Sequence, residues 1–130
     1  MALPIGLKGH AAEVVTSENT ACAVGSGTLS VYATPCLCAL MEKAAWSSIA
    51  PYLSEGESTV GTQLNITHLS ASPVGMHVWA ESEVLAVDGR RIELKVSAYD
   101  EQGLIGEGTH QRFIVSDTLF LAKAGRKLEG

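Results

Sequence analysis

The segment between Pro35 and Pro51 most constrains the fold, because its pattern is that of a helix with apolar residues on nearly every side. Thr34 before Pro35 is typical of a helix start, since Thr is a good N-cap and Pro suits the first helical position. Pro51 marks the expected end. The only charged residues of the segment are Glu42 and Lys43. A helix that is apolar all round is buried rather than laid on a surface.

The rest of the chain is patterned mainly as strands. A polar-apolar mixture at 7–15 indicates an N-terminal edge strand, and residues 19–33, which carry no charge, indicate a flexible loop, a short turn or a lid. After the helix the apolar period changes to two, and the dipeptide Asp88-Gly89 is a hairpin signal. Alternation in the first of these strands places one set of side chains on a common face, namely Val60, Thr62, Leu64, Ile66 and His68. The four expected strands are 60–68, 76–87, 91–99 and 104–115.

This order predicts an α+β fold in which a strongly curved antiparallel sheet wraps around one long buried helix. The length of 130 residues fits one domain, 1–130, with a short helix after Ser116 and a frayed end at 125–130. Only 18% of the residues are charged, against roughly 25% in ordinary globular proteins. The low charge suggests that a second subunit covers part of the surface.

Charge and composition exclude several classes of function. The 14 acids outnumber the 9 bases, which does not favour a nucleic-acid partner. We expect neither a signal peptide nor a membrane segment, and we therefore expect a cytoplasmic protein. The three cysteines are expected to be reduced and buried, and the four histidines are too scattered for a metal motif. Neither a metal nor a cofactor is expected.

Three polar residues stand in positions where chemistry is plausible. Glu42 lies within an apolar helical stripe, although it could reach solvent or pair with an arginine. Thr34 stands at a helix N-terminus, where unpaired N–H groups favour a developing oxyanion, but it could simply be a cap. His68 ends an apolar strand face and could equally be a structural residue. His77 and His110 are interpreted as structural.

Short motifs occur in a fixed order over roughly residues 8–118: Val31-Tyr-Ala-Thr-Pro35, Ala39-Leu-Met-Glu-Lys-Ala44, Thr59-Val-Gly-Thr62, Thr67-His68-Leu69, Ser72-Pro-Val-Gly-Met76, Val87-Asp-Gly-Arg90 and Gly106-Glu-Gly-Thr-His110. Together they resemble the hot-dog acyl-CoA thioesterases of the fluoroacetyl-CoA thioesterase type. The resemblance implies a hot-dog fold and hydrolysis of a small acyl-CoA thioester without a cofactor, since CoA is part of the substrate.

The resemblance also implies roles for individual residues. It assigns catalysis to Thr34, Glu42 and His68, with either Thr34 or Glu42 as the attacking group. Gly61 would admit a small acyl group close to the backbone. The fluoroacetyl-specific member carries phenylalanines in a lid before the helix, whereas residues 19–33 contain none. The resemblance therefore does not imply which acyl group this protein accepts. A non-catalytic protein that binds acyl-CoA or another apolar ligand, and a hot-dog hydratase, stay open as alternatives.

Helix geometry predicts how the site is assembled. Thr34 and Glu42 are eight residues apart, which is about 12 Å along a helix axis. One thioester carbonyl cannot easily contact both within one chain, so we expect a homodimer with two composite sites. The CoA phosphates need cationic partners, for which Arg90, Arg91 and Arg112 on the sheet are the candidates, although all three could equally be solvated charges on strand faces.

Overall fold

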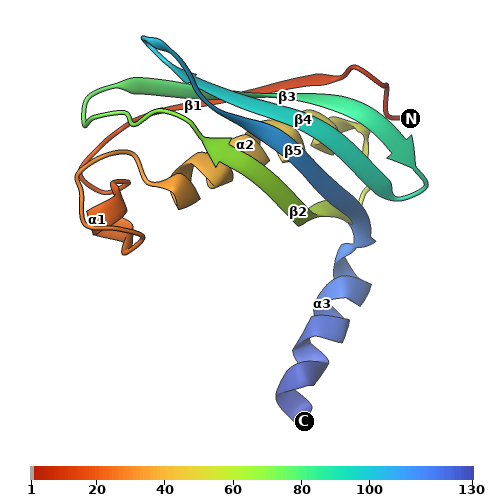
Figure 1. Ribbon diagram of the computed structural model, residues 1–130. Helices are drawn as coiled ribbons and strands as arrows, with labels where there is room; N and C mark the ends of the chain where they lie inside the picture. Colours follow the sequence, from red (N-terminus) through yellow and green to blue (C-terminus); the bar gives the residue numbers. More distant parts are fainter. Residues whose placement is uncertain (1) are drawn as a thin grey trace.

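The computed structural model describes residues 2–130 and shows five antiparallel strands curled around one long helix (Figure 1). The sheet order β1-β3-β4-β5-β2 leaves β1 and β2 as the two edges. The helix α2 (Thr34–Ile49) lies against the concave face, which confirms the predicted α+β arrangement. The strands are β1 (Lys8–Val14), β2 (Glu57–His68), β3 (His77–Asp88), β4 (Arg91–Asp100) and β5 (Gly103–Ser116).

One face of α2 forms the centre of the core. Leu37 and Met41 pack against one end of the sheet and Ile49 against the other, and all three are fully buried. Burial of each such side chain contributes about 1.5–3 kcal/mol. The prediction of a helix buried all round is wrong for the opposite flank, where Trp46 is 46% exposed. The helix lies near the edge strand β2 there, and the sheet of one chain does not extend further.

The start of α2 differs from the expectation. Ala33 occupies the N-cap position and makes no side-chain cap, so the prediction that Thr34 is the cap is wrong. Thr34 is the first helical residue, and its hydroxyl is free for another partner. The helix ends at Ile49 and continues as a 3-10 turn, η1 (Ala50–Tyr52), which contains Pro51 as expected.

The uncharged segment before α2 is tethered to the body of the protein. It contains a one-turn helix, α1 (Ala21–Val24), and is fixed by isolated bridges from Thr20 to Tyr32 and from Val31 to Pro73. The buried Tyr32 hydroxyl donates to Glu13 on β1. Burial, followed by the Glu13 hydrogen bond and charge, raises the pKa of Tyr32 above its usual range, so the phenol stays a donor. The two ends of the segment are therefore held against the rest of the protein.

A β-bulge divides β2. Its pairing with β5 shifts between Gly61 and Gln63, so that Thr62 is an extra residue. Before the bulge, Thr59 and Gly61 face the helix; after it, Ile66 does. The prediction of one continuous face from Val60 to His68 is wrong for Val60 and Thr62, since one inserted residue reverses the alternation.

The C-terminal residues form a helix, α3 (Asp117–Gly125), which projects away from the sheet beyond β5 (Figure 1). A 3-10 turn, η2 (Arg126–Glu129), follows it. Among residues 2–130, no helix combines the length and apolar character needed to cross a membrane. Cys36 and Cys38 are half-buried, but Cys22 is exposed, so the prediction of buried cysteines is wrong there.

Candidate active site

Thr34 and His68 form a pair between the start of α2 and the end of β2. The Thr34 hydroxyl lies 2.7 Å from His68 Nδ1. A hydroxyl within hydrogen-bond reach of an imidazole is the arrangement used by activated oxygen nucleophiles. The two candidates that the sequence placed on separate elements thus come together in one chain.

The environment of His68 favours the neutral ring. Burial lowers the pKa of His68 below its usual range, with the nearby Ser70 backbone acting in the opposite direction. Nε2 of this ring is buried and has no hydrogen-bond partner within residues 2–130. A neutral imidazole with Nδ1 facing a hydroxyl can accept the hydroxyl proton.

A second cluster joins α2 to β5. Arg112 Nη1 lies 3.0 Å from Glu42 Oε2, and the arginine side chain is only 6% exposed whereas that of the glutamate is 40% exposed. Thr59 on β2 holds the other edge of the guanidinium through its hydroxyl, 2.8 Å from Nε, and its carbonyl, 2.9 Å from Nη2. Glu42 therefore has the arginine partner that the sequence left open, with part of the carboxylate still accessible.

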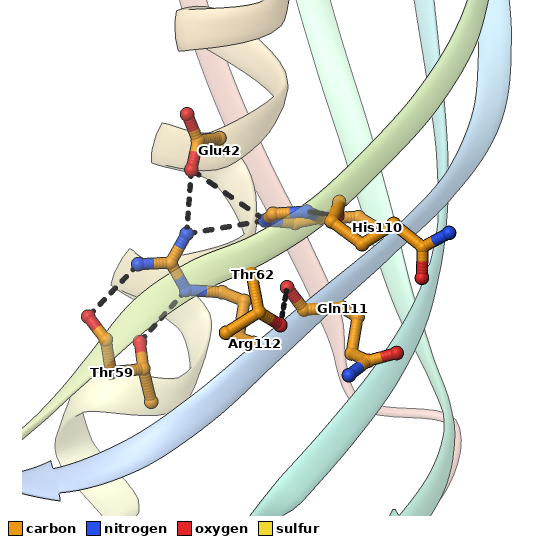
Figure 2. Close-up of polar contacts among 7 residues, drawn as sticks. Glu42, Thr59, Thr62, His110, Gln111 and Arg112 are labelled. Atoms are coloured by element: carbon orange, nitrogen blue, oxygen red, sulfur yellow. Dashed lines mark hydrogen bonds and ion pairs between the residues drawn. The ribbon is translucent and has the colours of Figure 1, made fainter.

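His110 completes this cluster from β5. Its Nε2 lies 3.1 Å from Arg112 Nη1 and 3.9 Å from Glu42 Oε2, and its Nδ1 lies 2.8 Å from the Gln63 carbonyl (Figure 2). From the sequence alone, His110 is interpreted as structural and Thr59 is not singled out. The signal that could have found the histidine is its spacing of two from Arg112, which puts both side chains on one face of a strand.

Gly61 leaves the room that this cluster occupies. A Cβ built on Gly61 would lie 2.3 Å from Glu42 Oε2 and 3.3 Å from Arg112 Nη1. Only a residue without a side chain lets the strand approach the carboxylate this closely. The predicted importance of Gly61 thus has a geometric basis, although its predicted contact with substrate stays a prediction.

The two clusters do not meet within one chain. The Thr34–His68 pair lies at the N-terminal end of α2 and Glu42 about 12 Å along its axis. Within residues 2–130 no hydrogen bond or ion pair joins Glu42 to either Thr34 or His68. One chain therefore holds a hydroxyl–imidazole pair and a separate carboxylate.

The predicted phosphate-binding arginines lie in different environments. Arg90 and Arg91 are at the exposed hairpin between β3 and β4, where they lie 3.5 Å from Glu57 and 3.3 Å from Asp88 respectively. Arg112 is buried, and most of its N–H groups are used within the chain. Phosphate contacts by all three stay predictions.

A hollow of about 370 Å³ lies beside Arg112 between α2 and β2. Its lining includes Trp46 and Thr59, so it adjoins the Glu42 cluster. A larger hollow of about 420 Å³ lies across β1, β3 and β4 and adjoins neither cluster. Among residues 2–130, no three His, Cys, Asp or Glu side chains gather as a metal site would require.

Known proteins are similar to this chain in both sequence and fold. The family described as FlK, fluoroacetyl-CoA-specific thioesterase, matches residues 15–118. The fluoroacetyl-CoA thioesterase of Streptantibioticus cattleyicolor is 41% identical over 97 residues, 75% of this chain and 70% of that protein.

Solved structures agree with this match. A structure of the fluoroacetyl-CoA thioesterase FlK superposes with a TM-score of 0.93 at 33% identity, covering 98% of each chain. A point mutant of that thioesterase in complex with fluoroacetate and CoA gives 0.86 at 33% identity, covering 91% of this chain and 99% of the other. The predicted hot-dog fold is thereby confirmed.

Proposed function

This chain belongs to the fluoroacetyl-CoA-specific thioesterase family, and from that premise we propose that it hydrolyses a small acyl-CoA thioester with Thr34, His68 and Glu42. The chain is an acyl-CoA thioesterase; the size of the acyl group and the residue roles are the proposal. The observation that carries the roles is the 2.7 Å contact between the Thr34 hydroxyl and His68 Nδ1.

The first half of the reaction uses the Thr34–His68 pair. The Thr34 oxygen attacks the thioester carbon while His68 accepts its proton, and the N-terminal end of α2 stabilises the oxyanion. The carbon–sulfur bond then breaks, and the proton on His68 passes to the CoA sulfur. Free CoA thiol leaves, and the acyl group stays on Thr34 as an ester.

The second half uses the Glu42 carboxylate as a general base. Glu42 accepts a proton from a water molecule, and the hydroxide so formed attacks the carbonyl carbon of the acyl ester. The bond to the Thr34 oxygen then breaks, the acid is released, and the proton passes from Glu42 to the Thr34 oxygen. Arg112 at 3.0 Å is the counter-ion that holds the carboxylate in place. Water and the thioester are consumed, and an acid and a thiol are formed.

The separation of the two clusters supports a homodimer with composite sites. The edge strand β2 has a free side along 12 residues, which is a template for pairing with another copy. Antiparallel packing of two α2 helices brings Glu42 of one protomer towards Thr34 of its partner. The 40% exposed Glu42 side chain and the exposed Trp46 lie on the flank that such a partner would cover.

Thiol release from acetyl-, propionyl- and fluoroacetyl-CoA tests the function. Glu42→Gln keeps an acceptor for Arg112, and His68→Gln keeps a polar side chain, so both variants should fold. Each should lose kcat by about 100-fold or more, since proton transfer by a positioned group contributes that much. Glu93→Gln and His77→Gln, both on exposed positions, are the matched controls and should retain activity.

Mass analysis of quenched reactions distinguishes the two candidate nucleophiles. In Glu42→Gln, the acyl group should accumulate on the peptide that contains Thr34. An acyl group on the Glu42 peptide of the wild type would assign the attack to the carboxylate instead. Saturable binding of CoA esters without thiol release would contradict hydrolysis and favour a ligand-binding protein.

A further inference from the structure

The surroundings of His110 fix which of its nitrogens carries a proton. The side chain is 1% exposed, and Nδ1 lies 2.8 Å from the Gln63 carbonyl oxygen. Because a carbonyl can only accept, Nδ1 is the protonated nitrogen. The other nitrogen, Nε2, then has a free lone pair as long as the ring is neutral.

That lone pair faces Arg112. A guanidinium has no acceptor, so the 3.1 Å contact between Nη1 and His110 Nε2 is donated by the arginine. The same Nη1 donates to Glu42 Oε2 at 3.0 Å. A continuous chain of hydrogen bonds thus starts at the Gln63 carbonyl. It runs on from His110 through Arg112 to the Glu42 carboxylate, and Figure 2 shows this part of it.

His110 restricts the guanidinium where Thr59 does not. Thr59 holds Nε and Nη2, on the edge of the guanidinium away from the carboxylate. Nη1 has two hydrogens, and His110 accepts the one that Glu42 does not. With both accepted, the plane of the guanidinium is set from three sides, and with it the direction in which Glu42 is held.

The protonation state agrees with this geometry. Burial is the largest cause that lowers the pKa of His110, and Arg112 lowers it further, while the Gln63 bond and Glu42 act in the opposite direction. The ring therefore stays neutral at pH 7 and keeps its acceptor.

We propose that His110 is a positioning residue for hydrolysis, which acts through Arg112 to orient the Glu42 carboxylate. The inference rests on the proposed role of Glu42 as the base. His110 does not touch the substrate in this scheme. Its contribution is the acceptor Nε2, which no apolar residue of similar size would supply.

Two amide variants separate the acceptor from the donor. The Asn amide in His110→Asn lies near the position of Nδ1, so it keeps a donor for the Gln63 carbonyl but loses the acceptor for Arg112. His110→Gln reaches the position of Nε2 and presents an oxygen there. We expect kcat for acetyl-CoA to fall about 10- to 100-fold in His110→Asn with KM nearly unchanged, and to recover largely in His110→Gln. His77→Asn and His77→Gln are the controls.

A double-mutant cycle tests whether the effect passes through Arg112. In an Arg112→Lys background, His110→Asn should lower kcat by less than about twofold, because residues in one network are not additive. An undiminished loss in that background, or equal kcat values for wild type and His110→Asn, would overturn the inference.

A second variant covers the case in which His110→Asn does not fold. His110→Leu then takes its place with the same expected loss. Absence of thiol release from the wild type contradicts the proposed function itself. Normal wild-type hydrolysis together with a fully active His110→Asn or His110→Leu contradicts only the role of His110.

Discussion

Two histidines, the half-buried His68 and the buried His110, carry the protonation chemistry of this protein at the scale of the residue. In the proposed reaction His68 accepts the Thr34 hydroxyl proton at Nδ1, 2.7 Å away, whereas His110 donates through Nδ1 to a carbonyl and accepts through Nε2 from an arginine. The proposed roles of the two histidines require both imidazole rings to be neutral. Burial is the main cause that lowers both pKa values below the usual range.

These shifts predict how stability depends on pH. Since the unfolded rings titrate near pH 6.5 and the folded rings below it, the unfolded chain binds more protons between those values. The free energy of unfolding should therefore be highest above about pH 7 and fall as the pH drops through 6.5 towards the folded pKa values.

Urea denaturation between about pH 7.5 and 5.5 measures this dependence. His68→Gln and His110→Gln should each flatten the decline, and the double variant should flatten it most. A free energy of unfolding that stays constant or rises on acidification over this range would contradict the neutral state of both rings in the folded protein.

The strand β2 is the element on which the site depends most. Its segment before the bulge supplies Thr59 and Gly61 to the Glu42 cluster, and its last residue is His68. Because Gly61 lies against the carboxylate, a methyl group there cannot be accommodated without moving Glu42 or Arg112.

Gly61→Ala should therefore reduce kcat strongly. The added Cβ would lie 2.3 Å from Glu42 Oε2, so the carboxylate must leave its place. Because the displaced atom is the end of a flexible side chain that is 40% exposed, the loss should appear in kcat and much less in Tm. Gly125→Ala on α3, where a Cβ meets nothing within 4 Å, is the matched control and should change neither value. Full activity of Gly61→Ala would show that the close approach is dispensable.

The elements themselves are largely predictable from the sequence, and the details at β2 are not. Apolar patterning predicts α2 and the four long strands within a few residues, because burial imposes the periods of 3.6 and 2. The bulge at Thr62 leaves no such signal in the sequence. Val60 and Ile66 are both apolar and six residues apart, so the sequence suggests that they lie on one face, although the inserted residue places them on opposite faces. Arg112 likewise resembles a surface cation in the sequence, because its partner Glu42 is 70 residues away in the chain.

At the scale of the whole molecule, the proposed dimer predicts a result that would not be seen if each active site lay within a single chain. If Thr34 and His68 of one protomer act with Glu42 of its partner, mixing two inactive variants should restore activity. In a heterodimer of Glu42→Gln and His68→Gln, one site carries both substitutions and the other carries none.

Random reassembly of equal amounts should return about a quarter of wild-type activity, because half of the dimers carry one intact site of two. Thiol release after co-denaturation and refolding measures this, and sedimentation confirms the dimer. Each variant refolded alone is the control. No recovery in a mixture that sedimentation shows to be dimeric would place all catalytic groups within one chain.

The single extra residue in β2 also adds to the distance along the strand between the two clusters. His68 and Gly61 stand on one strand, on opposite sides of Thr62, and each fixes one of the two clusters. Within one chain, the spacing along β2 between His68 and the glycine that adjoins the carboxylate is thus set by the backbone of that strand. A residue inserted or deleted between Gly61 and His68 would therefore shift one cluster relative to the other along the strand.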